Sequence, residues 1–112
     1  MQVMINEDRN GTRTVLAVNG EIDIATAPTL RQRIQDAVDD GVRLVAVDLT
    51  EVGFMDSTGL GVLIGGLKRL RQLEGNLVVV SPSDSVRKIF EVTGLVDVFG
   101  VVDSLDQVAD QS

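Results

Sequence analysis

The residues with the clearest chemical potential are Asp56 and Ser57, which lie between an apolar strand pattern and a Gly-rich apolar run. Their side-chain oxygens can accept hydrogen bonds from the first free amides of a helix, so either residue can serve as the N-cap. The same amides and the positive end of the helix dipole would also accommodate an anion, including a phosphate attached to a serine. Two interpretations follow: an ordinary helix cap, or a serine that is regulated by phosphorylation.

The residue types that most catalytic sites need are missing from the sequence. It has no His and no Cys, which excludes a Ser-His-Asp triad, a His metal site, a thiol nucleophile and a zinc ribbon. Among the carboxylates, Asp56 and Asp48 stand in apolar settings, but a carboxylate that caps a helix is stabilised as an anion. We therefore expect a protein that is not an enzyme and has no metal and no cofactor.

The glycines around residue 60 suggest a nucleotide-binding loop, but their spacing does not fit one. Gly59, Gly61 and Gly65 give G-x-G-x-x-x-G, and no acidic residue ends the next strand to contact a ribose. Gly61 and Gly66 have the gap of a phosphate-binding loop, but Leu67 stands where that loop needs lysine. Each glycine inside a helix costs about 1 kcal/mol relative to Ala, so Gly61, Gly65 and Gly66 suggest close approach by a strand, another helix or a partner. Of these, we expect close packing within the fold.

Composition is that of one ordinary globular domain over residues 1–112, with 44% hydrophobic and 24% charged residues. The 10 basic and 17 acidic residues give a formal charge of −7. This charge argues against binding to nucleic acid or an anionic membrane and favours a partner with a basic surface. No apolar run approaches 18 residues and no signal-peptide pattern opens the chain, so we expect a cytoplasmic protein.

The elements that must position Ser57 follow from hydrophobic periodicity and turn residues. Residues 3–5 and 14–18 are predicted strands joined by a turn at Asn10-Gly11, and Asn19-Gly20 is expected to close the second strand. A loop would then present Glu21 and Asp23. Apolar residues in succession over 43–49 predict a strand buried on both faces.

Helices are predicted from Thr26, the expected cap, to Gly41, from about residue 58 to 73, and from a start at Ser81-Pro82 to Gly94. In the third helix Asp84 would occupy the N3 position of a capping box. Further strands are expected at 77–80 and 96–102, and a last helix would follow a cap at Asp103 or Ser104. The fold class is therefore α/β: a mixed sheet of four to five strands that starts with an antiparallel hairpin, with about four helices.

Three segments resemble one known family. Residues 54–62, Phe-Met-Asp-Ser-Thr-Gly-Leu-Gly-Val, resemble the phosphorylation motif of bacterial anti-sigma factor antagonists, the STAS-domain proteins. Gly20-Glu21-Ile22-Asp23 resembles an early signature of the family. The stretch from Ser81-Pro82 to Phe90, with Thr93-Gly94-Leu95, resembles its third helix and stop. The resemblance covers almost the whole chain, and it implies a single STAS-like domain.

The resemblance also implies roles for particular residues. Ser57 aligns with the serine that the partner anti-sigma factor, an ATP-binding protein kinase, phosphorylates. Asp56 would position the loop, Asp23 would contact the kinase, and Thr58 could compete with Ser57 as the acceptor. The expected partner-binding set is completed by neighbouring glycines: Asp23, Asp56, Ser57, Thr58, Gly59 and Gly61.

The resemblance implies a partner-switching cycle in transcription regulation, serving stress response or sporulation. The unphosphorylated protein would bind the anti-sigma factor and free the sigma factor. Phosphorylation of Ser57 would end this binding, and a serine phosphatase would restore it. Two alternatives remain: a STAS-type binding or scaffold module that senses a nucleotide or lipid, and a small enzyme that uses carboxylates.

Overall fold

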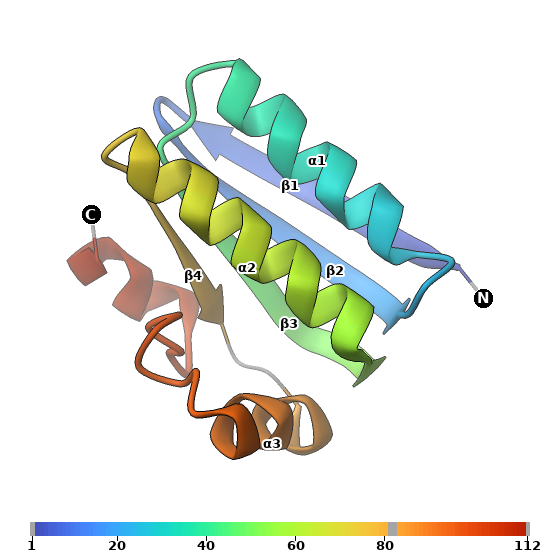
Figure 1. Ribbon diagram of the computed structural model, residues 1–112. Coiled ribbons are helices and arrows are strands. Elements are labelled where there is room, and N and C mark those ends of the chain that lie inside the picture. The colour runs from blue at the N-terminus through green and yellow to red at the C-terminus, as the bar shows by residue number, and fades with distance from the viewer. Residues whose placement is uncertain (1, 81–82, 112) are drawn as a thin grey trace.

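The computed structural model describes residues 2–80 and 83–111, in which strands and helices alternate after an initial hairpin. None of the helices in these ranges is long and apolar enough to cross a membrane. The elements, shown in Figure 1, are β1 (Val3–Asn10), β2 (Arg13–Ile22), α1 (Ala27–Asp39), β3 (Leu44–Met55), α2 (Ser57–Gln72), β4 (Asn76–Val80), α3 (Asp84–Thr93) and the 3-10 helix η1 (Leu105–Gln111).

The four strands form one mixed sheet in the order β1-β2-β3-β4. β1 pairs antiparallel with β2 across a two-residue loop, in which Gly11 adopts a φ of 64°. β2, β3 and β4 are parallel to one another. Because both helical crossovers step in the same direction along the sheet, α1 and α2 lie side by side on one face (Figure 1). The predicted α/β fold with an opening antiparallel hairpin is confirmed.

Both parallel strands next to the predicted site are longer than expected. β2 does not close at Asn19-Gly20 but continues to Ile22, with register shifts against β3 after Ala17 and Gly20. Gly20 has a φ of 126°, and a Cβ there would lie 2.6 Å from the Gln2 carbonyl oxygen. A glycine therefore lets the strand pass through an irregularity rather than end. β3 likewise runs on to Met55, so Glu21 pairs with Phe54 and Ile22 with Met55.

The predicted strand at 96–102 and the predicted fourth α-helix are wrong. In the described residues, this stretch contributes only an isolated parallel bridge between Val80 and Val102. Phe99 is buried and packs edge-on against Phe90, with ring centroids 5.4 Å apart. The apolar residues here fill the core from a turn, and the last segment is the 3-10 helix η1. The described part of the chain thus has three α-helices.

The start of α3 also differs from the prediction. Ser81 and Pro82 lie outside the described residues, and the helix begins at Asp84 with Ser83 in the N-cap position. Asp84 therefore occupies N1 and not N3. The Ser83 hydroxyl donates to the Val52 carbonyl at 2.8 Å instead of capping the helix. The end of α3 at Gly94 is confirmed, with a φ of 72°.

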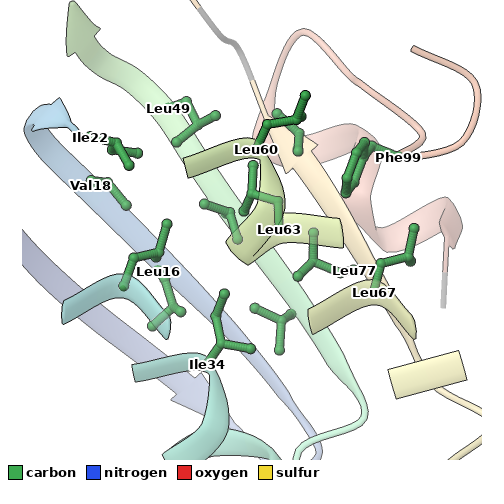
Figure 2. Close-up of a cluster of buried hydrophobic side chains, with 14 of the residues drawn as sticks. Leu16, Val18, Ile22, Ile34, Leu49, Leu60, Leu63, Leu67, Leu77 and Phe99 are labelled. Atoms are coloured by element: carbon green, nitrogen blue, oxygen red, sulfur yellow. The ribbon is translucent and has the colours of Figure 1, made fainter. Parts of the chain in front are cut away.

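The main core lies between the helical layer and one face of the sheet, as Figure 2 shows. Leu16 and Val18 of β2 meet Ile34 of α1, while Leu63 and Leu67 of α2 project toward the same layer. The other face of the sheet carries a smaller apolar cluster covered in part by η1: Leu44, Ala46, Val78, Val80 and Val108. β3 is thus buried on both faces, as predicted, and α2 begins directly after it.

Candidate functional site

The predicted phosphoacceptor lies at the carboxyl edge of the parallel strands. Asp56 follows β3 in an extended conformation, with φ −100° and ψ −173°, and Ser57 is the first residue of α2. The Asp56 amide donates to the Ile22 carbonyl at 3.1 Å, which joins the ends of β2 and β3. Parallel strands with helical crossovers place their loops at one edge, which is where α/β proteins bind ligands and partners.

Asp56, and not Ser57, caps the helix. One carboxylate oxygen, Oδ1, accepts from the Thr58 amide at 2.9 Å, from the Gly59 amide at 3.3 Å and from the Thr58 hydroxyl. The hydrogen bond from the Thr58 hydroxyl, followed by those from the two amides, holds the pKa of Asp56 below its ordinary value. The cap is therefore charged at neutral pH. The expectation that Ser57 itself serves as a cap is wrong.

The two neighbouring hydroxyls differ in their availability. Ser57 is exposed, and among the hydrogen bonds of the described residues none involves its hydroxyl. Thr58 is half-buried and its hydroxyl donates to Asp56. A reaction at Thr58 would have to break the cap, whereas a reaction at Ser57 would not. The geometry thus distinguishes two candidate acceptors that the sequence alone could not rank by accessibility.

Asp23 forms the turn that links β2 to α1. Its Oδ1 accepts from the Ala25 amide at 2.9 Å and the Thr26 amide at 3.0 Å. Thr26 is in the N-cap position of α1, but its hydroxyl donates to the Glu21 carbonyl at 2.7 Å and does not cap the helix, contrary to our expectation. The local role of Asp23 is therefore to shape a loop beside Asp56. Its contact with a kinase stays a prediction.

The glycines of α2 fall into two groups. A Cβ at Gly59 would lie 2.5 Å from an Ile22 side-chain atom, and one at Gly66 would lie 3.1 Å from side chains of α1 and β4. The predicted close internal packing is confirmed for Gly66, and Gly59, for which no packing was predicted, is also closely packed. Gly61 and Gly65 have nothing within 4 Å of such an atom, so this reason is wrong for them. Gly59 is buried and Gly61 is exposed, and their roles in partner binding stay predictions.

Two exposed apolar side chains at this end of the sheet were not among the binding residues that the sequence predicted. Ile24, in the loop after β2, is 77% exposed, and Phe54, near the end of β3, is 48% exposed. Both belong to the segments joined by the bond between Asp56 and Ile22. Phe54 could have been found from the sequence, because it is a large apolar residue just before the polar motif. For Ile24 the signal appears only when β2 and β3 are seen to end side by side.

The amino end of α3 is tied to the strand that carries the site. The hydroxyl of Ser83 donates to the Val52 carbonyl at 2.8 Å, and that of Ser85 to the Gly53 carbonyl at 3.2 Å. These bonds occupy backbone acceptors of β3 that precede the Asp56-Ser57 pair. The start of α2 is thus supported by β2 on one side and by α3 on the other.

Comparison with known proteins gives matches over nearly the whole chain. The STAS domain family model matches residues 4–108. The anti-sigma-B factor antagonist of Listeria monocytogenes is 41% identical over 96 residues, which are 85% of this chain and 83% of that protein. An anti-sigma factor antagonist from Mycobacterium paratuberculosis has a similar structure, with a TM-score of 0.88 and 30% identity, covering 98% of this chain and 93% of that one.

The fold is also that of the Bacillus cell fate determinant SpoIIAA, whose structures are known in the unphosphorylated and phosphorylated forms. Their TM-scores are 0.83 and 0.77, with 23% and 22% identity. Each comparison covers 96% of this chain, and 95% and 98% of the two SpoIIAA chains. From the family model and the Listeria relative together, the chain belongs to the STAS-domain family, the family of the anti-sigma factor antagonists.

Proposed function

We propose that this protein is an anti-sigma factor antagonist that switches partners through phosphorylation of Ser57. Unphosphorylated, it binds an anti-sigma factor that is also a serine kinase, and the sigma factor is released. The observation that carries this proposal is the exposed Ser57 hydroxyl at the first position of α2, next to an aspartate that already caps the helix. The names of the relatives support the same function.

The phosphate would act on the surface of the protein. The Thr58 and Gly59 amides, which could have received an anion, are already bonded to Asp56. A phosphate on Ser57 would therefore project outward, where the helix dipole favours it and the Asp56 carboxylate opposes it. It adds about −1.5 to −2 charges at neutral pH, and the fold does not have to change.

A docking surface around Ser57 would explain why this charge ends binding. Ile24 and Phe54 supply exposed apolar area near a neutral hydroxyl. A partner fitted to this surface would have to desolvate the phosphate and accept its bulk. A loss of about 3 kcal/mol of binding free energy corresponds to a more than hundredfold weaker complex. A serine phosphatase would reverse the switch.

The direct test is incubation with the anti-sigma factor of the same organism and ATP, followed by mass spectrometry of the product. We expect one phosphate, on Ser57. Ser57→Ala should fold, bind the anti-sigma factor and accept no phosphate, whereas Ser57→Asp should bind at least tenfold more weakly, equivalent to about 1.4 kcal/mol. Phosphate on Thr58 or Ser85 instead of Ser57 would contradict the assignment, as would unchanged binding of the phosphorylated protein.

A further inference from the structure

A surface groove of about 540 Å³ separates α1 from α2, the two helices that lie side by side in Figure 1. Its floor is apolar and buried, formed by Ala27, Ile34 and Val38 of α1. Thr58 and Arg69 of α2 also line it, eleven positions apart, which corresponds to about 16 Å at 1.5 Å per helical residue. The groove therefore extends along α2 from a residue adjacent to Ser57.

The groove remains open because α2 presents no side chain at two positions. Gly61 and Gly65 line it, both are exposed, and a Cβ at either would meet no other group within 4 Å. By contrast, Gly66 is held by close contacts to Ile34 and Leu77. Packing within the fold accounts for Gly66 but not for Gly61 and Gly65. Their effect in the folded chain is to leave an apolar channel unfilled.

The charges around the groove are opposite to those of the chain as a whole. Its thirteen lining residues include Arg31 and Arg69 and no carboxylate, although the chain has 17 acidic and 10 basic residues. Arg69 is paired with Asp39 at 2.5 Å. Arg31 is exposed and takes part in none of the ion pairs or side-chain hydrogen bonds among the described residues. An unneutralised cation therefore stands beside an apolar channel.

We propose that this groove binds a single-chain amphiphile with an anionic head group, of the free fatty acid class. The aliphatic chain lies over Gly61 and Gly65 against Ile34 and Val38, and the carboxylate pairs with Arg31. The volume falls within the roughly 300–1,000 Å³ of small-molecule sites, which are mostly apolar with a few placed polar groups. The groove shares Ile24, Thr58 and Gly61 with the surface expected to bind the anti-sigma factor, but Ser57 does not line it. Binding of an amphiphile can therefore be tested on the unphosphorylated protein without the kinase.

The test is titration of the intact protein with dodecanoate below its micelle concentration, followed by calorimetry and by amide chemical shifts. We expect saturable binding and shifts confined to α1 and α2. Butyrate, which has the head without the chain, and dodecyltrimethylammonium, which has the chain with a cationic head, should both bind at least tenfold more weakly, equivalent to about 1.4 kcal/mol.

Variants of the groove locate the binding. Gly65→Leu should remain folded, since its side chain enters open space, and should weaken dodecanoate binding at least tenfold, equivalent to about 1.4 kcal/mol. Arg31→Gln should weaken dodecanoate binding and reduce the preference over the cationic amphiphile. Lys68→Gln is the matched control: it removes an exposed cation of α2 that does not line the groove, and binding should not change.

Three results would overturn the proposal: no saturable binding of dodecanoate, binding that is unchanged in Gly65→Leu, or equal binding of the cationic and anionic amphiphiles. If the protein bound phosphatidylglycerol vesicles but not dodecanoate, the groove would instead be a contact site for a membrane surface. Loss of anti-sigma factor binding in Gly65→Leu, with no binding of dodecanoate to the unmodified chain, would assign the groove to protein docking. The Ser57→Ala experiment is unaffected by any of these outcomes, so the two proposals can fail separately.

Discussion

At the scale of single residues, the start of α2 depends on the carboxylate of Asp56. Its Oδ1 receives hydrogen bonds from two backbone amides and one hydroxyl. Asp56→Ala should lower the free energy of unfolding by about 1 kcal/mol, the usual cost of losing an N-cap. Urea denaturation measures this, and Asp97→Ala is the control, because Asp97 is exposed and its side chain takes part in none of the ion pairs or hydrogen bonds among the described residues. An unchanged stability would mean that the cap contributes nothing.

The same carboxylate should make the start of α2 sensitive to acid. The pKa of Asp56 is lowered in the folded protein by the Thr58 hydroxyl and the two amides, so its contribution to stability is complete above the unfolded pKa, about 3.9. This contribution is lost as the pH falls through the lower folded pKa. Amide exchange at Thr58 and Gly59 should therefore show protection at pH 6 that declines below about pH 4.

Glu7 is a second carboxylate whose pKa is lowered in the folded protein, so it too makes stability fall in acid. The pH experiment therefore needs a control for Glu7. The pKa of Glu7 is lowered, first by its hydrogen bond from Arg9. Its stabilisation is likewise present above its unfolded pKa and lost in acid, and it lies on β1. Glu7→Gln should leave the acid response of the Thr58 and Gly59 amides intact, whereas Asp56→Asn should remove most of it. A response at these amides that survives in Asp56→Asn would contradict the assignment.

At the scale of elements, the glycines of α2 predict opposite effects of one substitution. Gly59→Ala would place a methyl group 2.5 Å from an Ile22 atom and 2.7 Å from a Met55 atom, and should destabilise the fold by about 1–3 kcal/mol. Gly65→Ala meets open space and gains helix propensity, so it should stabilise by up to about 1 kcal/mol. The two midpoints of urea unfolding, compared with the unmodified chain, check both signs. Equal effects would mean that the two glycines have the same environment.

At the scale of the whole molecule, one end of the sheet should carry the partner surface. Ile24→Ser and Phe54→Ser should weaken anti-sigma factor binding while changing stability by less than about 0.5 kcal/mol, because both side chains are exposed. Leu105→Ser is the matched control: Leu105 is 45% exposed, close to the 48% of Phe54, but it lies on η1, lining a different hollow with Asn10 and Leu44. Calorimetry with the anti-sigma factor measures all three. Equal losses in all three variants would argue against a localised surface.

The sequence by itself determined the order of the elements as far as α3, the class of the fold and the position of Ser57 near a helix start. These features depend on local chemistry: hydrophobic period, the ends of α1 and α3 at Gly41 and Gly94, and an apolar run that marks β3 as central. Each of these features depends on a few neighbouring residues, and tertiary packing did not change it. The motif around Ser57 could be recognised for the same reason, because its residues are consecutive in the sequence.

Only the tertiary structure decided how those elements meet. Pairing between Glu21 and Phe54 extends β2 and β3 beyond their local turn signals and brings Ile24 to the same end of the sheet as Ser57. Hydrogen bonds to Asp56 make it the cap, and among the described residues none involves the Ser57 hydroxyl. Burial of Phe99 against Phe90 holds a turn where a strand was expected. The groove over Gly61 and Gly65 depends on the spacing of two packed helices, a non-local quantity that no stretch of sequence encodes.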